Sequence, residues 1–163
     1  MGLAFSDDKQ LNGKRRSIFP ILSLSVCSLI LASCNEPFIL AAGGALEGPV
    51  AEAPSKWNLD KDSALAQLET QPNDPYSINF TYVQLDGRLY AYAGDTRTNW
   101  VANIEKNPLV RVRLQNKIYA ARAIRVTGSE ELNNFASVWT DLSVFQRDPI
   151  QFDEVWLYRL EAR

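Results

Sequence analysis

Apolar and polar residues alternate along most of the chain after residue 56, and this period of two predicts β-strands. Between Tyr76 and Tyr82, aromatic and aliphatic residues occupy one face, and Ser, Asn and Thr occupy the other. Asp86-Gly87 is typical of a tight hairpin turn, from which the chain returns as a second strand. The same alternation predicts further strands over residues 109–114, 118–126 and 155–160.

The stretch 64–70 is ambiguous, because its residues favour a helix by propensity while an antiparallel arrangement of the other strands requires a strand there. With it, the chain has five or six antiparallel strands. A sheet this small usually closes into a barrel, which removes its unpaired edges. The sequence therefore predicts a mainly β fold, a β-barrel with α additions.

Two short helices are predicted between the strands. Thr96 is placed to cap the first, which ends at Asn107-Pro108 because the residue before a proline leaves the helical region. Thr127 and Glu130 have the spacing of a capping box for the second, which runs to about Asp141. Its apolar stripe consists of Phe135, Val138, Trp139 and Leu142.

The N-terminal segment has the pattern of a secretory signal. Lys14-Arg15-Arg16 precedes an apolar run over 18–31, which is shorter than the roughly 20 residues that span a bilayer comfortably. The run ends in Leu31-Ala32-Ser33-Cys34, which resembles the bacterial lipobox. This pattern predicts cleavage before Cys34 and acylation of its sulfur, so that palmitate and related acyl chains anchor the protein. The alternative is an uncleaved anchor helix with an incidental cysteine.

The chain divides on this basis into a lipoprotein signal peptide (1–33), a lipidated tether (34–55) and a barrel domain (56–163). The tether is predicted because its glycines, alanines and prolines show no amphipathic period. Asn35 follows the cysteine where an Asp would, in the enterobacterial sorting pattern, retain the protein in the inner membrane. We therefore expect a location at the periplasmic face of the outer membrane.

Composition excludes several classes of function. The net charge is −2, and the chain after residue 33 is more acidic still, which argues against nucleic-acid binding. The absence of histidine excludes His-based catalysis, His metal sites and His ligation of haem. Cys27 and Cys34 both lie in the N-terminal segment, so no free thiol remains after processing and no metal site is expected. No nucleophile–base pair supports a hydrolase, and no catalytic residue is assigned.

The order of pieces from Asp86 to Val126 resembles the pyridoxamine-phosphate-oxidase-like split β-barrel superfamily, most closely its small nitroreductase-like branch. The likeness lies in the 86–90 hairpin, a Gly/Thr/Arg loop over 94–98 leading into Trp100, and Asn107-Pro108 followed by a strand of alternating Val and Arg. The resemblance implies a six-stranded antiparallel split barrel with two short helices. It also implies a homodimer with a flavin near the subunit interface.

The resemblance assigns the phosphate of FMN to Thr96, Arg97 and Thr98, with Trp100 as an aromatic neighbour of the ring. The residues suit an anion, because a helix N-terminus, hydroxyls and a guanidinium all favour one. A plain helix cap with a solvated Arg97 is the alternative. F420 is disfavoured because its branch of the superfamily needs a basic loop where this chain has Gln71-Pro-Asn-Asp-Pro75, and haem is disfavoured because haem-using members employ His.

Two functions remain open from the sequence. One is a membrane-anchored extracytoplasmic FMN-binding protein of the nitroreductase-like oxidoreductase type, in which the cofactor carries the chemistry. The other is a non-catalytic lipoprotein that uses the barrel groove to bind a partner or small ligand. For Arg111 and Arg113, which share one strand face, exposure to solvent is favoured over a role in phosphate binding or dimerisation.

Overall fold

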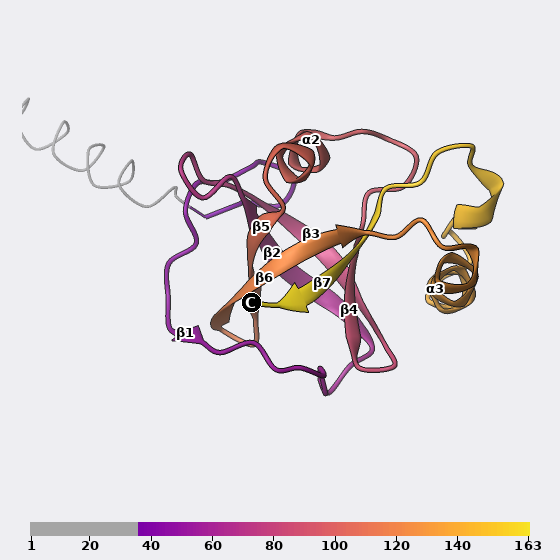
Figure 1. Cartoon of the computed structure of the whole chain (residues 1–163), viewed down its shortest axis with the longest axis horizontal. Coiled ribbons are helices and arrows are strands. Elements are labelled where there is room, and N and C mark those ends of the chain that lie inside the picture. The colour runs from indigo at the N-terminus through magenta and orange to yellow at the C-terminus, as the bar shows by residue number, and fades with distance from the viewer. Residues whose placement is uncertain (1–35) are drawn as a thin grey trace, which may run out of the picture. The chain divides into compact units, whose positions relative to one another are not determined.

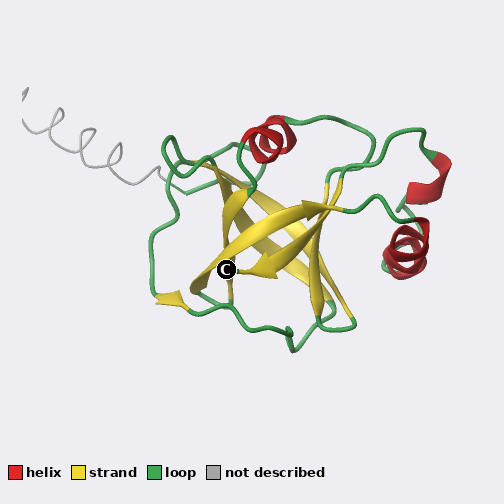
Figure 2. Cartoon of the chain, viewed as in Figure 1, coloured by secondary structure: helices red, strands yellow, loops and turns green. Residues whose placement is uncertain are grey.

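The computed structural model of the protein describes residues 36–163, so the predicted signal peptide and Cys34 lie outside the described residues. The strands and helices are arranged as in Figure 1, and Figure 2 distinguishes them by type. In chain order the elements are β1 (Val50–Ala51), β2 (Ser63–Thr70), β3 (Tyr76–Leu85), β4 (Arg88–Tyr92), α2 (Asn99–Lys106), β5 (Leu109–Leu114), β6 (Lys117–Arg125), α3 (Ser129–Asp141), the 3₁₀ helix η2 (Pro149–Gln151) and β7 (Leu157–Ala162).

Six of the strands close into a barrel. The antiparallel ladders run β2–β3, β3–β4, β4–β7, β7–β6, β6–β5 and β5–β2, which returns to the first strand. The short β1 adds to β6 as an extra parallel strand. The prediction of a mainly β, six-stranded antiparallel barrel with two helices is confirmed.

The ambiguous stretch 64–70 lies within β2, which pairs with β3 over its whole length and with β5. Ala66 and Leu68 point into the barrel and are almost fully buried. Ladder hydrogen bonds and burial on alternate positions therefore outweigh the helical propensity of the residues.

The turns that set the strand register use backbone conformations in the left-handed region. Asp86 and Gly87 have φ of 54° and 76°, as the predicted hairpin requires. Gln115 and Asn116, with φ of 48° and 63°, make the equivalent turn between β5 and β6. Both turns fit the right-handed twist of the strands that they join.

Two apolar clusters hold the fold together. The larger fills the barrel and includes the fully buried Leu68, Leu89 and Val112. The smaller lies outside the barrel wall, where Tyr90 and Leu157 pack against Phe135 of α3. The barrel thus buries one face of β4 inside and covers the other with a helix.

The helix starts differ from the sequence prediction. The N-cap of α2 is Thr98 rather than Thr96, although the helix ends at Asn107 as expected. The N-cap of α3 is Gly128, so the predicted capping box of Thr127 and Glu130 is wrong. At the box position of this helix stands Glu131, whose carboxylate instead binds side chains of the barrel. Neither α2 nor α3, nor any other helix in residues 36–163, has the length and hydropathy needed to cross a bilayer.

The segment predicted as a tether lies along the barrel over its described part, residues 36–55. Gly43 and Ser77 exchange two backbone hydrogen bonds, at 2.9 and 2.8 Å, and β1 pairs with β6. Leu46 is 2% exposed. Backbone hydrogen bonds of this kind leave no periodic pattern of side chains, which is why the sequence did not reveal the packing.

The arginines of β5 also differ from expectation. Arg111 donates to the buried carboxylate of Glu69 and to the Leu46 carbonyl, and Glu69 accepts the Leu46 N–H. Arg113, which is mostly buried, donates to Glu36 and Gln67. These two arginines therefore tie the N-terminal segment to the barrel instead of facing solvent.

Candidate functional site

A cleft of about 420 Å³ opens where the end of β4 and the start of α2 face the segment after α3. This volume falls within the usual range for small-molecule sites. Ala93 N–H donates to the Trp156 carbonyl and Trp156 N–H donates to the Gly94 carbonyl, both at 2.9 Å, which fixes the two sides to each other. In Figure 1 the β4–α2 connection accordingly passes beside the chain that leads from η2 into β7. The cleft is lined by Tyr92, Ala93, Gly94, Thr98, Trp100, Trp139, Phe145, Gln146, Arg147 and Phe152.

Aromatic rings form much of the cleft wall. Tyr92 meets Trp139 edge to face with ring centroids 5.0 Å apart, and both rings contact Phe135 behind them. Trp100 is 7% exposed and packs against Tyr158 in the core. Phe145, by contrast, is almost fully exposed at the mouth. The wall offers aromatic surface of the kind that a planar ligand contacts, beside the polar side chains of Thr98, Gln146 and Arg147.

Two hydroxyls in this wall are buried without a protein partner among the described residues: Tyr92 Oη and Thr98 Oγ1. A buried hydroxyl without a partner is costly, so such groups call for an explanation. Burial, with a smaller contribution from Asp95, raises the pKa of Tyr92 to about 12 against the opposing charge of Arg147. Tyr92 therefore keeps its proton at neutral pH and remains a hydrogen-bond donor.

The charges near the cleft are paired to different degrees. Arg147 lies at the rim with its guanidinium 4.5 Å from the Phe152 ring centroid and 3.3 Å from Asp95 Oδ2. This pair is long and largely exposed, so it is weak. Arg97 Nε instead donates to Glu105 at 2.7 Å, with Nη2 at 2.5 Å from the same carboxylate oxygen. Arg147 is the more available of the two cations.

The structure places the four predicted cofactor residues in two groups. Thr98 and Trp100 line the cleft, together with the loop glycine Gly94. Thr96 does not line it and donates from Oγ1 to Asp95 at 3.3 Å. Arg97 is likewise absent from the lining and pairs with Glu105. Of the predicted 96–98 loop, the last residue, Thr98, lines the cleft, and Arg97 does not.

Sequence reasoning missed Tyr92, Trp139 and Arg147. Tyr92 lies in the strand that follows the Asp86-Gly87 turn and Trp139 in the apolar stripe of the second predicted helix, and nothing in their spacing marks them as neighbours. Arg147 lies in a loop with no motif around it. One signal was available: Tyr92 is the strand's last aromatic residue before the Gly94 loop, where a side chain on the outer face falls beside that loop.

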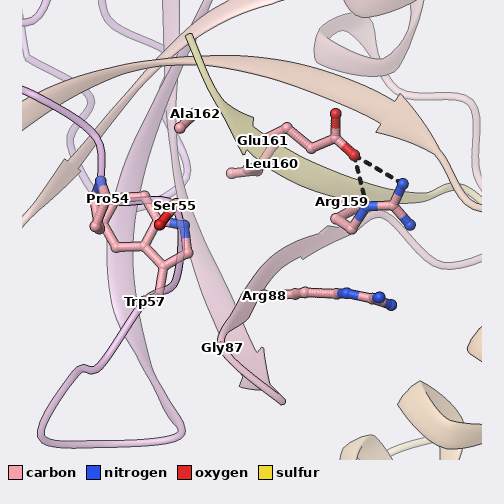
Figure 3. Close-up of a pocket in the computed structure, with 9 residues that line it drawn as sticks. All are labelled: Pro54, Ser55, Trp57, Gly87, Arg88, Arg159, Leu160, Glu161 and Ala162. Carbon is pink, nitrogen blue, oxygen red and sulfur yellow. Dashed lines mark hydrogen bonds and ion pairs between the residues drawn. The ribbon is translucent and has the colours of Figure 1, made fainter.

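A second pocket of about 280 Å³ lies at the other end of β4 and β7 (Figure 3). Arg88 and Arg159 extend from these strands, with Trp57 and Pro54 across from them. Arg159 Nη1 donates to both oxygens of Glu131 at 2.7 Å, while its Nε and Nη2 donate to Glu161. The charged side chains here already pair with one another or with Glu131, which makes this pocket the weaker candidate. In residues 36–163, no three or more Asp, Glu, Cys or His side chains are grouped as a metal site.

Comparison with known proteins yields structural neighbours but no sequence family. No family model matches the chain, and neither does any curated protein. A solved structure of a putative pyridoxamine 5′-phosphate oxidase from Listeria innocua is 14% identical, with 61% of this chain and 83% of that chain covered and a TM-score of 0.48. General Stress Protein 26 from Bacillus anthracis is 23% identical, covering 60% and 78%, with a TM-score of 0.47.

A FAD-binding protein from Mesorhizobium loti is 16% identical, covering 61% of this chain and 78% of that chain, with a TM-score of 0.42. By name, one of these three neighbours is a putative pyridoxamine 5′-phosphate oxidase and another is a FAD-binding protein. At these identities and TM-scores the likeness carries no argument about ligand or activity.

Proposed function

We propose that the protein is a membrane-anchored extracytoplasmic flavin-binding protein of the split-barrel type and that FMN binds in the aromatic cleft. The observation that carries the proposal is the pair of buried hydroxyls, Tyr92 Oη and Thr98 Oγ1, in the wall of a cleft of about 420 Å³. A flavin ring is planar and has hydrogen-bond acceptors on its edge. It would cover the aromatic wall, and it would accept from both hydroxyls once a shift of the wall exposes them, since neither oxygen is solvent-accessible in this structure.

The other cleft residues suit the rest of such a ligand. Arg147 at the rim offers a charge-assisted hydrogen bond to a phosphate. The predicted loop residues Thr96 and Arg97 directly follow Asp95, the ion-pair partner of Arg147. When bound, the flavin supplies hydride or electron transfer, as in oxidoreductases of the nitroreductase-like type. The residues of this chain bind the ring, orient it and exclude water from its buried face.

A specific observation favours a second candidate, a non-catalytic lipoprotein that binds a small ligand or partner segment in the same cleft. Arg97 is already engaged by Glu105, and Arg147 faces Asp95. The cleft is therefore close to neutral, and a doubly charged phosphate gains less there than in a site with free cations. A neutral aromatic ligand would use the same wall and hydroxyls.

The two candidates are separated by titration of residues 36–163 with FMN and with riboflavin, followed by flavin fluorescence. We expect FMN to bind, and Tyr92→Phe and Thr98→Val each to weaken it about three- to tenfold, because each removes one hydrogen bond. Tyr82→Phe is the matched control, since the Tyr82 hydroxyl donates to the Lys61 carbonyl away from the cleft. If neither flavin binds at about millimolar concentration, flavin binding is excluded and the non-catalytic candidate stands.

Anchoring and assembly belong to the same proposal. Cys34 carries the acyl chains, and the barrel lies at the periplasmic face of the outer membrane. Mass spectrometry of the mature protein should find an N-terminal acylated Cys34, while Cys34→Ser should accumulate at precursor length. A homodimer is supported by the exposed Val144, Phe145 and Ile150 beside the cleft. Light scattering on residues 36–163 should then give twice the chain mass.

A further inference from the structure

Three consecutive apolar side chains near the start of the described chain face solvent. Phe38, Ile39 and Leu40 are 75%, 69% and 97% exposed, and we call them the 38–40 turn. Phe38 and Ala41 exchange two backbone hydrogen bonds, at 3.0 and 2.8 Å, which close the turn, and Ile39 has a φ of 52°. A contiguous exposed apolar group of this kind is unfavourable in water and marks a contact surface.

The turn is attached to the barrel at defined points. Asn79 Nδ2 donates to the carbonyls of Pro37 and Ile39, both at 3.1 Å. Arg113 Nη1 donates to Glu36 at 2.7 Å just before the turn. The carbonyls of Pro37 and Ile39 and the carboxylate of Glu36 are thus bound to the barrel, while the three apolar side chains of the turn are exposed.

The position of the turn in the chain indicates what covers it. Phe38 is four residues after Cys34, so their Cα atoms are at most about 14 Å apart. Acyl chains on Cys34 hold that residue at the surface of the bilayer. Whatever the orientation of the barrel, the turn therefore stays close to the acylated residue and to the bilayer surface that holds it.

We propose that the 38–40 turn inserts into the lipid bilayer beside the acylated Cys34 and fixes the orientation of the barrel on the membrane. The proposal rests on the acylation included in the proposed function. Residues 36–55 contain three Glu and no Lys or Arg, so the contact depends on apolar insertion and not on anionic lipid. In Figure 1 the described chain starts on the opposite side of the barrel from α3, so this orientation keeps α3 and the segment after it toward the aqueous phase.

The test places a fluorescent reporter on the turn. Leu40→Cys is made in the full chain, and the mature protein is labelled at this cysteine and reconstituted in phosphatidylcholine vesicles. Acylation leaves Cys34 without a thiol, so the label is specific. Leu65→Cys is the matched control, because Leu65 is 73% exposed on β2. We expect blue-shifted emission at position 40, with quenching by brominated lipid chains at least several-fold stronger than at position 65.

Other outcomes would overturn the proposal. Equal quenching of both labels by aqueous iodide would mean that the turn stays in water. Protection at position 40 that disappears when fewer proteins are present per vesicle would mean that a second copy covers the turn. A mature chain without acyl groups by mass spectrometry would remove the anchor from both this proposal and the proposed function. An acylated chain with a water-exposed label would overturn the docking alone, and the flavin titration is independent of either result.

Discussion

Tyr90 and Tyr92 stand two residues apart on β4, on the same outer face, and their hydroxyls differ in whether they have a partner. Both rings contact Phe135 of α3, with centroids 5.7 and 5.3 Å away. Burial is the main cause that raises the pKa of each to about 12. Tyr90 Oη donates to Glu131 at 2.7 Å, however, whereas Tyr92 Oη has no partner in the described part of the chain.

The difference separates a structural cluster from a binding site. Around Tyr90, the Glu131 carboxylate also accepts from Arg159 and lies 3.6 Å from Arg88, so each of these groups is engaged within the fold. Around Tyr92, the hydroxyls of Tyr92 and Thr98 are buried and make no hydrogen bond within the described part of the chain. An arginine beside a pocket is therefore a weaker indication of binding than a buried group whose hydrogen bonds are not yet made.

The largest effect is expected at the centre of the structural cluster. Glu131→Ala leaves Arg159 and the Tyr90 hydroxyl without their shared acceptor, and should lower the free energy of unfolding by about 2–3 kcal/mol. Urea denaturation measures this change. Glu130→Ala is the matched control, because Glu130 precedes it on the same helical turn and is exposed. Equal stability of the two variants would show that the cluster contributes little.

The second effect concerns the cleft. Arg147→Ala should weaken FMN binding about tenfold to hundredfold, the value of one charge-assisted pair of about 1.5–3 kcal/mol. Riboflavin, which lacks the phosphate, should bind the variant and the wild type equally. Arg97→Ala is the comparison, and a larger loss there would place the phosphate on the 96–98 loop, as the sequence predicts. Both arginines are more than half exposed, so neither change should alter apo-protein stability much.

The sequence predicted the barrel because its signals are local. Alternation within each strand, the Asp86-Gly87 turn and the stop at Pro108 all depend on neighbouring residues. The start of α3 was missed because Glu131 is engaged by the barrel rather than by its own helix cap. The packing of residues 36–55 was missed because it depends on backbone hydrogen bonds to distant strands.

The site was harder to predict than the fold because it is assembled from distant parts of the chain. Thr98 and Trp100 were identified, since they follow a recognisable loop into a helix. Tyr92 and Arg147 are 55 positions apart, yet the fold places both in the lining of one cleft, Tyr92 at the end of β4 and Arg147 in the loop between α3 and η2. No pattern in a single sequence records such a pairing.

A third prediction tests the two tyrosines against each other. Tyr90→Phe removes a hydrogen bond to a carboxylate and should cost about 1.5–2 kcal/mol of stability in the apo-protein. Tyr92→Phe removes a hydroxyl that has no partner, and should leave the stability unchanged or raise it by up to about 1 kcal/mol. Thermal and urea denaturation of both variants give the comparison. Equal losses would mean that Tyr92 Oη is satisfied in solution, which would remove the main support for the cleft as a binding site.

The smallest effect is a pH dependence that belongs to the cluster and not to the cleft. Burial alone would raise the pKa of Glu131, but hydrogen bonds from Arg159 and Tyr90, with the charges of Arg159 and Arg88, outweigh it and hold the pKa below its ordinary value of 4.5. A carboxyl with a lower pKa in the folded state stabilises the protein above the unfolded-state pKa, and this stabilisation is lost as the pH falls through the folded-state value.

Between about pH 5 and pH 3, wild type should therefore lose stability more steeply than Glu131→Gln, which cannot ionise at this position. Urea midpoints measured across this range give the two slopes, with Tyr92→Phe following the wild type because its hydroxyl takes no part in the cluster. Parallel curves for wild type and Glu131→Gln would mean that the Glu131 carboxyl has the same pKa in the folded and unfolded chain. The pH dependence of stability would then not separate the cluster from the cleft.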